Sequence, residues 1–179
     1  MQTSWQEVVQ ISQQYRNARV EYWLSETLFN FSWWILLVTT LGLFVIWVIL
    51  LDKKRVFEIL SYGFLVTTIS SILDIIGIYL MLWRYNHTLT PFSIPIEIHI
   101  IQMPIIYMII YQYFNPWKTF LLAIIINAFF FAFILEPLLV WLQVYELYNW
   151  KHSYSFIPYI LLGVLIKWVI HKLKQNNYA

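Results

Sequence analysis

Five polar side chains stand inside long apolar stretches of this 179-residue chain. They are Asp74, Glu97, His99, Gln102 and Glu136. A charged side chain at the centre of a bilayer costs about 2.5–3.5 kcal/mol on insertion scales, so such residues usually face a bundle interior or a watery cavity. Asp, Glu and His also relay protons and act as general acids and bases. We therefore predict an intramembrane polar cluster that binds, translocates or transforms a ligand.

The neighbours of the two most deeply placed acids favour such a cavity. Ser70 and Gly77 lie at i−4 and i+3 from Asp74, so they share its helical face. Small and hydroxylated residues let helices approach closely and hydrogen-bond to one another. Pro137 follows Glu136 and frees a backbone carbonyl one turn earlier. The alternative is that neutral acids only hydrogen-bond within the bundle and lock it, because burial in an apolar medium favours their neutral form.

A second group of polar residues follows the ends of two apolar stretches. It consists of Arg84, Trp150, Lys151 and His152. Aromatic and basic residues at such ends are typical of membrane-interface anchors. The alternative is a cationic outer mouth that receives an anionic lipid headgroup or substrate.

Several classes of site are excluded or unsupported. The chain has no cysteine, which excludes disulfides, thiolate metal sites and cysteine nucleophiles. Glu97 and His99 are two residues apart and would point about 200° apart on a helix. No HExxH spacing or glycine-rich phosphate loop occurs, so we predict no metal and no cofactor. The net charge of +2 is scattered, so no nucleic-acid partner is expected.

The composition indicates an integral membrane protein. Hydrophobic residues make up 61% of the chain and charged residues only 11%, whereas soluble domains carry about 25% charged residues. A stretch of about 20 apolar residues spans a bilayer. We predict an all-α polytopic bundle within residues 31–174, and no strands, because the apolar runs are too continuous for a membrane barrel. The five predicted transmembrane helices are about 31–51, 56–83, 92–114, 117–145 and 154–171.

The predicted bundle is flanked by two polar ends. Residues 1–30 lack the features of a signal peptide. They are expected to form one or two amphipathic turns on the membrane surface, or a frayed tail. Residues 175–179 form a short C-terminal tail.

The lysines and arginines predict an orientation. The N-terminal side of the predicted bundle carries Arg16, Arg19, Arg84 and Lys151. The other side carries Lys53, Lys54, Arg55, Lys118, Lys172 and Lys174, and Lys167 can reach it. The excess on the second side favours an outside N-terminus and an inside C-terminus. Asp74 and Glu136 then lie about 15 Å and 13 Å from the outer ends of their helices.

Short motifs between Asp74 and Lys167 resemble a known family. They are Pro95-Ile96-Glu97-Ile98-His99, Met103-Pro104, Tyr111-Gln112-Tyr113-Phe114, Glu136-Pro137-Leu138-Leu139, Trp150-Lys151-His152 and Tyr154-Ser155-Phe156. Together they resemble a family of small uncharacterised multi-pass membrane proteins of Gram-positive spore-forming bacteria. The resemblance implies a location in the cytoplasmic membrane. It implies no activity and no catalytic residue.

Three functions follow from these observations. The favoured one is a protein that binds or translocates a proton, a small cation or an amphiphile through the Asp, Glu and His cluster. The alternatives are a membrane-embedded acid–base enzyme acting on a lipid or isoprenoid, and a non-catalytic assembly or sensor subunit. The expected partners are the lipid bilayer, a lipid or small-ion ligand, and a second copy or another membrane protein.

Overall fold

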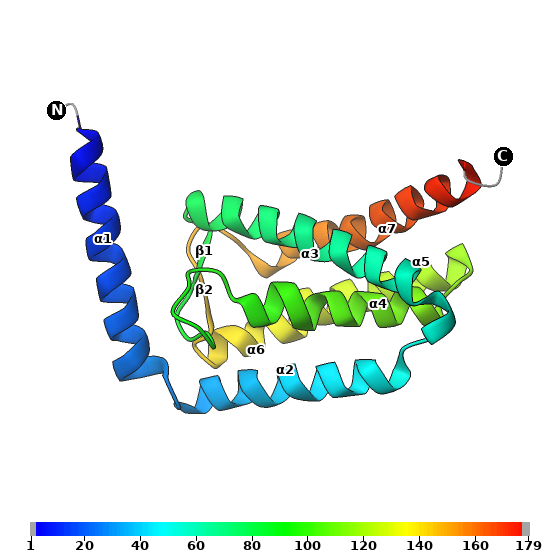
Figure 1. Cartoon of the computed structure of the whole chain (residues 1–179), viewed down its shortest axis with the longest axis horizontal. Coiled ribbons are helices and arrows are strands. Elements are labelled where there is room, and N and C mark those ends of the chain that lie inside the picture. The colour runs from blue at the N-terminus through cyan, green and yellow to red at the C-terminus, as the bar shows by residue number, and fades with distance from the viewer. Residues whose placement is uncertain (1–2, 177–179) are drawn as a thin grey trace.

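The computed structural model describes residues 3–176, and most of them are helical (Figure 1). The helical segments lie side by side and alternate in direction along the chain, which confirms the predicted all-α bundle. In chain order the segments are α2 (Phe31–Leu50), α3 (Val56–Tyr79), a π-helical turn (Glu97–Gln102) leading into α4 (Met103–Tyr113), α5 (Trp117–Phe130) continued by a π-helical turn (Phe131–Leu135) into α6 (Glu136–Trp141), and α7 (His152–Asn176).

Four segments among the described residues are long and apolar enough to cross a membrane. They are Phe31–Leu50, Lys53–Tyr79, Trp117–Trp141 and His152–Gln175. The segment predicted at 92–114 is shorter, because its helix begins only at Glu97. Pro91 and Pro95 disfavour helical backbone at the residues before them. The remaining helix, Glu97–Tyr113, is about 25 Å long at 1.5 Å per residue.

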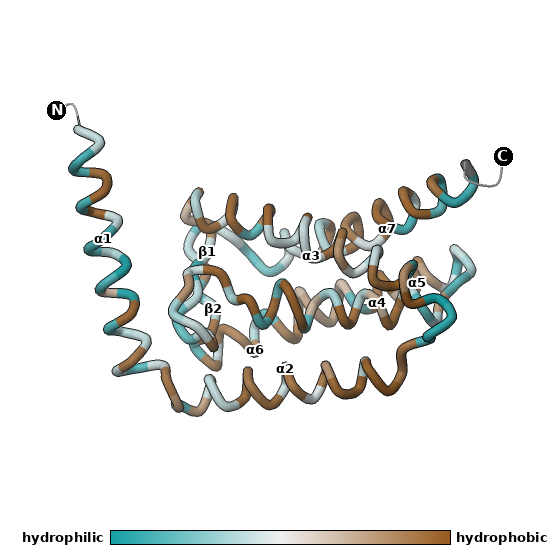
Figure 2. The backbone as a smooth tube through the Cα atoms, in the orientation of Figure 1, coloured by the Kyte–Doolittle hydropathy of each residue, from teal (hydrophilic) through white to brown (hydrophobic). Residues whose placement is uncertain are grey.

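The helices bury narrow faces and expose broad apolar ones. Figure 2 shows that α2 is coloured as hydrophobic over most of its length. In α2 the buried residues are Ser32, Leu36 and Thr40, one helical turn apart on a single face. Most of the other side chains of α2 are exposed and apolar. Exposed apolar surface on this scale is typical of helices that face lipid rather than water.

The core lies between α3, α4, α5 and α7. Its largest fully buried side chains include Tyr62, Tyr107 and Phe120. Gly163 lets α7 approach α5 closely, because a Cβ there would lie 2.7 Å from Ile124 Cδ1. The hydroxyl of Tyr62 in α3 donates a hydrogen bond of 3.1 Å to the Gly163 carbonyl, which ties α3 to α7 at the same position.

A short antiparallel ribbon forms where two helices were expected to continue. β1 (Trp83–Tyr85) pairs with β2 (Tyr145–Leu147), with Tyr85 opposite Tyr145. α3 therefore ends at Tyr79 and α6 at Trp141, rather than at 83 and 145 as predicted. The backbone turns through left-handed conformations at Met81 (φ 54°) and Gln143 (φ 56°) and leaves the helical path. The expectation of no strands was wrong.

The N-terminal segment is a long helix instead of one or two turns or a frayed tail. α1 (Trp5–Tyr22) continues through a π-helical turn to Thr27 and stands at a steep angle to the bundle (Figure 1). Ser4 and Glu7 form a capping box at its start. Arg19 anchors its other end by donating to Thr88 Oγ1 at 3.1 Å. Residues 1–2 and 177–179 of the predicted polar ends lie outside the described residues.

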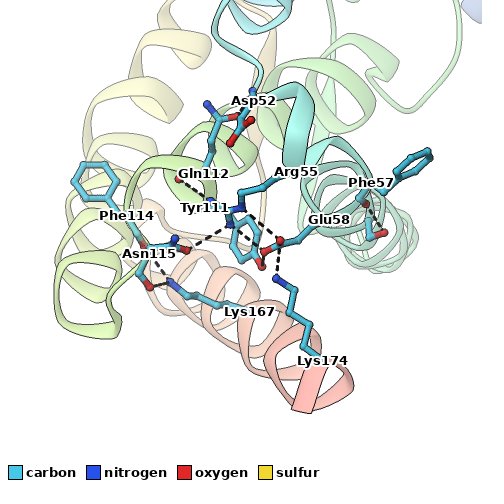
Figure 3. A network of polar contacts seen from close by, with 11 residues as sticks. Asp52, Arg55, Phe57, Glu58, Tyr111, Gln112, Phe114, Asn115, Lys167 and Lys174 are labelled. Carbon is cyan, nitrogen blue, oxygen red and sulfur yellow. Dashed lines mark hydrogen bonds and ion pairs between the residues drawn. The ribbon is translucent and has the colours of Figure 1, made fainter. Parts of the chain in front are cut away.

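A network of polar contacts closes the opposite end of the bundle (Figure 3). Glu58 accepts from Arg55 Nη2 at 2.9 Å and from Lys174 Nζ at 2.6 Å, and the Tyr111 hydroxyl also donates to it. Lys167 donates to two backbone carbonyls of the loop after α4, at 3.0 and 2.8 Å. These bonds join α3, α4 and α7 at the end that is remote from the β-ribbon.

Candidate functional site

A cavity of about 300 Å³ lies between α3, the turn before α4, α6, α7 and the β-ribbon. Four of the five predicted cluster residues line it, which are Asp74, His99, Gln102 and Glu136. Apart from these groups the wall is mainly aliphatic and aromatic. A mostly apolar pocket with a few convergent polar groups is the usual form of a small-molecule site, which typically holds about 300–1,000 Å³.

Asp74 is the centre of the first polar group. Its Oδ1 accepts hydrogen bonds of 2.8 Å from both Trp83 Nε1 and the Tyr85 hydroxyl. His99 Nε2 lies 3.4 Å from the same oxygen and 3.3 Å from the Tyr85 hydroxyl. Asp74 is only 2% exposed, so these contacts replace water around one side of its carboxyl group.

The β-ribbon and a glycine explain this geometry. Trp83 and Tyr85 are two residues apart on β1, so both side chains project from the same face. Gly77, one turn after Asp74, gives the indole of Trp83 room against α3, because a Cβ at Gly77 would lie 2.1 Å from the ring. The ribbon thus acts as a lid that carries two hydrogen-bond donors to Asp74.

Two atoms of this group have no hydrogen-bond partner. Oδ2 of Asp74 and Nδ1 of His99 are both buried and unpaired. If His99 carries its proton on Nε2, where it faces Asp74, then Nδ1 is an acceptor. The group therefore presents two unsatisfied acceptors within residues that line the cavity.

Glu136 forms the second polar group. Its Oε2 lies 2.8 Å from His152 Nδ1, and its Oε1 accepts a hydrogen bond of 2.8 Å from the Tyr159 hydroxyl. His152 and Tyr159 are seven residues apart in α7, so they lie on the same helical face. Ser155, between them, accepts a hydrogen bond of 2.9 Å from Trp150 Nε1. The cavity thus has a second carboxyl–imidazole pair.

The structure does not bring Glu97 into the cavity. Its Oε1 accepts a hydrogen bond of 3.0 Å from the backbone N–H of Leu89, and the residue is 2% exposed. It holds the loop between β1 and the following helix instead. Gln102 lines the cavity and also donates to Thr40 Oγ1 at 2.7 Å, which ties the turn before α4 to α2.

The four predicted outer-mouth residues divide into two pairs. Trp150 lines the cavity and His152 pairs with Glu136. Arg84 lies between the two inward residues of β1 and contacts Met81 Sδ, while Lys151 is exposed. Neither Arg84 nor Lys151 is among the residues that line the cavity, and the cationic outer mouth stays a prediction.

Four aromatic residues of the site were not singled out by the sequence. They are Trp83, Tyr85, Tyr145 and Tyr159. The first three lay at the ends of predicted helices, and Tyr159 lay among many packing aromatics. The Trp-x-Tyr spacing after Leu82 was the one available signal, since alternation is characteristic of a strand.

The ribbon tyrosines remain neutral hydrogen-bonding groups. Burial raises the pKa of Tyr85 well above its ordinary value of 10.0, and nearby Asp74 adds to the increase. Burial likewise raises the pKa of Tyr145. Both side chains therefore keep their O–H across the pH range in which the protein would work.

The cavity reaches the outer surface of the bundle between α3 and α7. Leu73 and Ile76 of α3 line it, and each is also 48% exposed. Pro158 of α7 lines it from the other side and is also exposed. The opening therefore has apolar edges, which suit a molecule arriving from an apolar phase.

Within residues 3–176 no group of three His, Asp or Glu side chains is placed to hold a metal ion. Comparison of the chain with protein-family models, curated proteins and solved structures finds no match.

Proposed function

We propose that this chain is an integral membrane protein that binds an amphiphile, a molecule with a hydrocarbon chain and a small polar head, in the cavity beneath the β-ribbon. The observation that carries the proposal is the composition of that cavity. Its wall is mainly apolar, its few polar groups converge from four helical segments and the ribbon, and its opening has apolar edges. Burial of a hydrocarbon chain stabilises a complex by about 25 cal/mol per Å² of apolar surface removed from water.

The arrangement of polar groups favours amphiphile binding over translocation of a proton or cation. A membrane relay needs titratable or hydrated groups at successive depths. Between the cavity and the Glu58 network the core is closed by packed side chains such as Val66, Met108 and Ile166. The acids and imidazoles at and beside the cavity are thus separated from the Glu58 network by packed side chains, and they can hold a head group at their end of the bundle.

The two carboxyl–imidazole pairs favour a second candidate, acid–base catalysis on the bound molecule. Asp74 faces His99 and Glu136 faces His152, and each carboxyl group lines the same cavity. Such pairs can remove a proton and return it elsewhere on a ligand. Conversion of the bound molecule by the native protein, abolished in both Asp74→Asn and Glu136→Gln even when these variants are saturated with that molecule, is the result that would establish it.

Binding is tested by native mass spectrometry of the protein released from the membranes in which it is made. A retained adduct whose mass is that of a lipid-like molecule, and which organic solvent extracts, is the expected result. Protein that is fully free of adducts, and to which no added long-chain compound binds in nanodiscs, would contradict the proposal.

We further propose that five segments cross the membrane, with the N-terminus outside, the C-terminus inside and α1 along the outer surface. The basic residues Arg55, Lys167 and Lys174 gather at one end, which supports the cytoplasmic assignment of that end. The steep angle between α1 and the bundle supports a surface position for α1 (Figure 1).

Because the chain has no cysteine, single-cysteine labelling tests this topology directly. In intact cells a membrane-impermeant maleimide should label Ser4→Cys, and it should label Gln175→Cys only after the cells are lysed. The reverse pattern would place the cavity on the cytoplasmic side, and labelling of both in intact cells would contradict an odd number of spans.

A further inference from the structure

With Asp74 ionised and the His99 proton on Nε2, facing Asp74, the two unpaired atoms of the cavity group are acceptors. Asp74 Oδ2 and His99 Nδ1 are buried and lack any partner within the protein, and both residues line the cavity. Asp74 Oδ1, by contrast, already receives the indole N–H of Trp83 and the hydroxyl of Tyr85. A buried acceptor left without a donor costs about 1–3 kcal/mol, so a ligand that supplies the donor gains this energy on binding.

Most donors around the cavity are already committed to the protein, and the Tyr145 hydroxyl is the exception among the described lining residues. Trp83, Tyr85 and Tyr159 donate to the two carboxyl groups, Trp150 donates to Ser155, and Gln102 donates to α2. No lysine or arginine among the described residues lines the cavity. An anionic head such as a carboxylate or phosphate would therefore enter without a cation to pair with, beside two carboxyl groups.

We infer that the head of the bound amphiphile is a hydrogen-bond donor, a hydroxyl or amino group on a hydrocarbon chain. This inference rests on the proposed function. The head donates to Asp74 Oδ2 and lies beside His99 Nδ1, while the chain lies along the apolar wall and reaches the opening at Leu73 and Ile76. A hydroxyl satisfies one acceptor, and an amino group can satisfy both.

A competition experiment with matched chains tests this inference. The full-length protein in lipid nanodiscs is given equal amounts of dodecan-1-ol, dodecylamine, dodecanoic acid and methyl dodecanoate, and native mass spectrometry measures the bound fraction of each. The alcohol, the amine or both should exceed the ester and the acid by about tenfold, which is the effect expected from pairing one buried acceptor. The ratio of alcohol to amine then identifies which donor the site takes.

Two isosteric variants test whether the preference for donor heads arises at Asp74. Asp74→Asn keeps an oxygen for Trp83 and Tyr85 but replaces the unpaired acceptor by an amide N–H, so the preference over the ester should fall to near unity. Glu97→Gln makes the same change at an equally buried carboxyl group that does not line the cavity, and the preference should remain. If Asp74→Asn does not fold, the ligand series on the native protein decides the question alone.

The outcomes separate the inference from the proposed function. Equal binding of all four compounds, or preference for the acid or the ester, overturns a donor head while amphiphile binding itself stands. Equal loss of preference in Asp74→Asn and Glu97→Gln also overturns it, because the effect would then not arise in the cavity. Binding of none of the four compounds removes the proposed function together with the inference.

Discussion

At the scale of single residues, the two acids of the cavity differ in how fully they are paired. Glu136 has a partner on each oxygen, whereas Asp74 has all its donors on one oxygen and none on the other. The sequence indicated that both acids lie in one polar cluster, because both stand inside long apolar stretches at similar distances from the predicted outer helix ends. It could not indicate the pairing, because Trp83 and Tyr85 reach Asp74 only through the ribbon.

A buried histidine outside the cavity predicts a response to pH. His87 Nδ1 lies 3.0 Å from Thr27 Oγ1, where the π-helical turn after α1 meets the loop after β1. Burial lowers the pKa of His87 from its ordinary 6.5, and Arg19 lowers it further while Glu26 opposes the change. Neutral His87 stabilises the contact between this turn and this loop. Its contribution is fully present above about pH 6.5 and is lost as the pH falls through the lowered pKa.

Hydrogen exchange of the backbone amides of α1 measures this response. Protection should decrease between pH 7 and pH 5 after correction for the intrinsic rate. His87→Asn can still hydrogen-bond to Thr27 but cannot titrate, so its protection should be nearly independent of pH. An equal loss of protection in this variant would assign the response to another group.

At the scale of elements, the β-ribbon covers one end of the cavity in the helix bundle. It ends α3 and α6, covers the cavity and supplies Trp83, Tyr85 and Tyr145. Hydropathy predicted the long helices well, since each one must expose an apolar face of bilayer length. Hydropathy could not predict two three-residue strands, because Trp, Tyr and Leu are also common at the ends of membrane helices.

A pair of glycine variants tests the packing of the β-ribbon against α3 at Gly77. Gly77→Ala places a Cβ 2.1 Å from Trp83, so it should displace the indole, weaken its bond to Asp74 and destabilise the protein by about 1–3 kcal/mol. Gly42→Ala has nothing within 4 Å and should be neutral or stabilising, because alanine is the better helix former. Unfolding monitored in detergent with increasing denaturant compares the two. Equal stability of both variants would contradict the close packing of Trp83 on α3.

At the scale of the whole molecule, the elements of the candidate site gather at one end. This end contains the cavity, the β-ribbon, the loop held by Glu97 and the C-terminal end of α1. A charged network closes the other end of the bundle (Figures 1 and 3). The sequence predicted this asymmetry in part, through acids and imidazoles at one depth. The sequence could not distinguish a binding cavity from acids that only hydrogen-bond within the bundle. The volume between helices depends on side-chain packing, which periodicity does not encode.

The measurement that tests the central claim most directly compares two neighbouring leucines of α7. Leu162 lines the cavity and is 6% exposed, whereas Leu161 is 48% exposed on the outer face of the helix. In native mass spectrometry with dodecan-1-ol, Leu162→Trp should fill the cavity and abolish binding, and Leu161→Trp should bind like the native protein, with both variants checked for equal thermal stability. Undiminished binding by a stable Leu162→Trp protein would show that the amphiphile does not occupy this cavity.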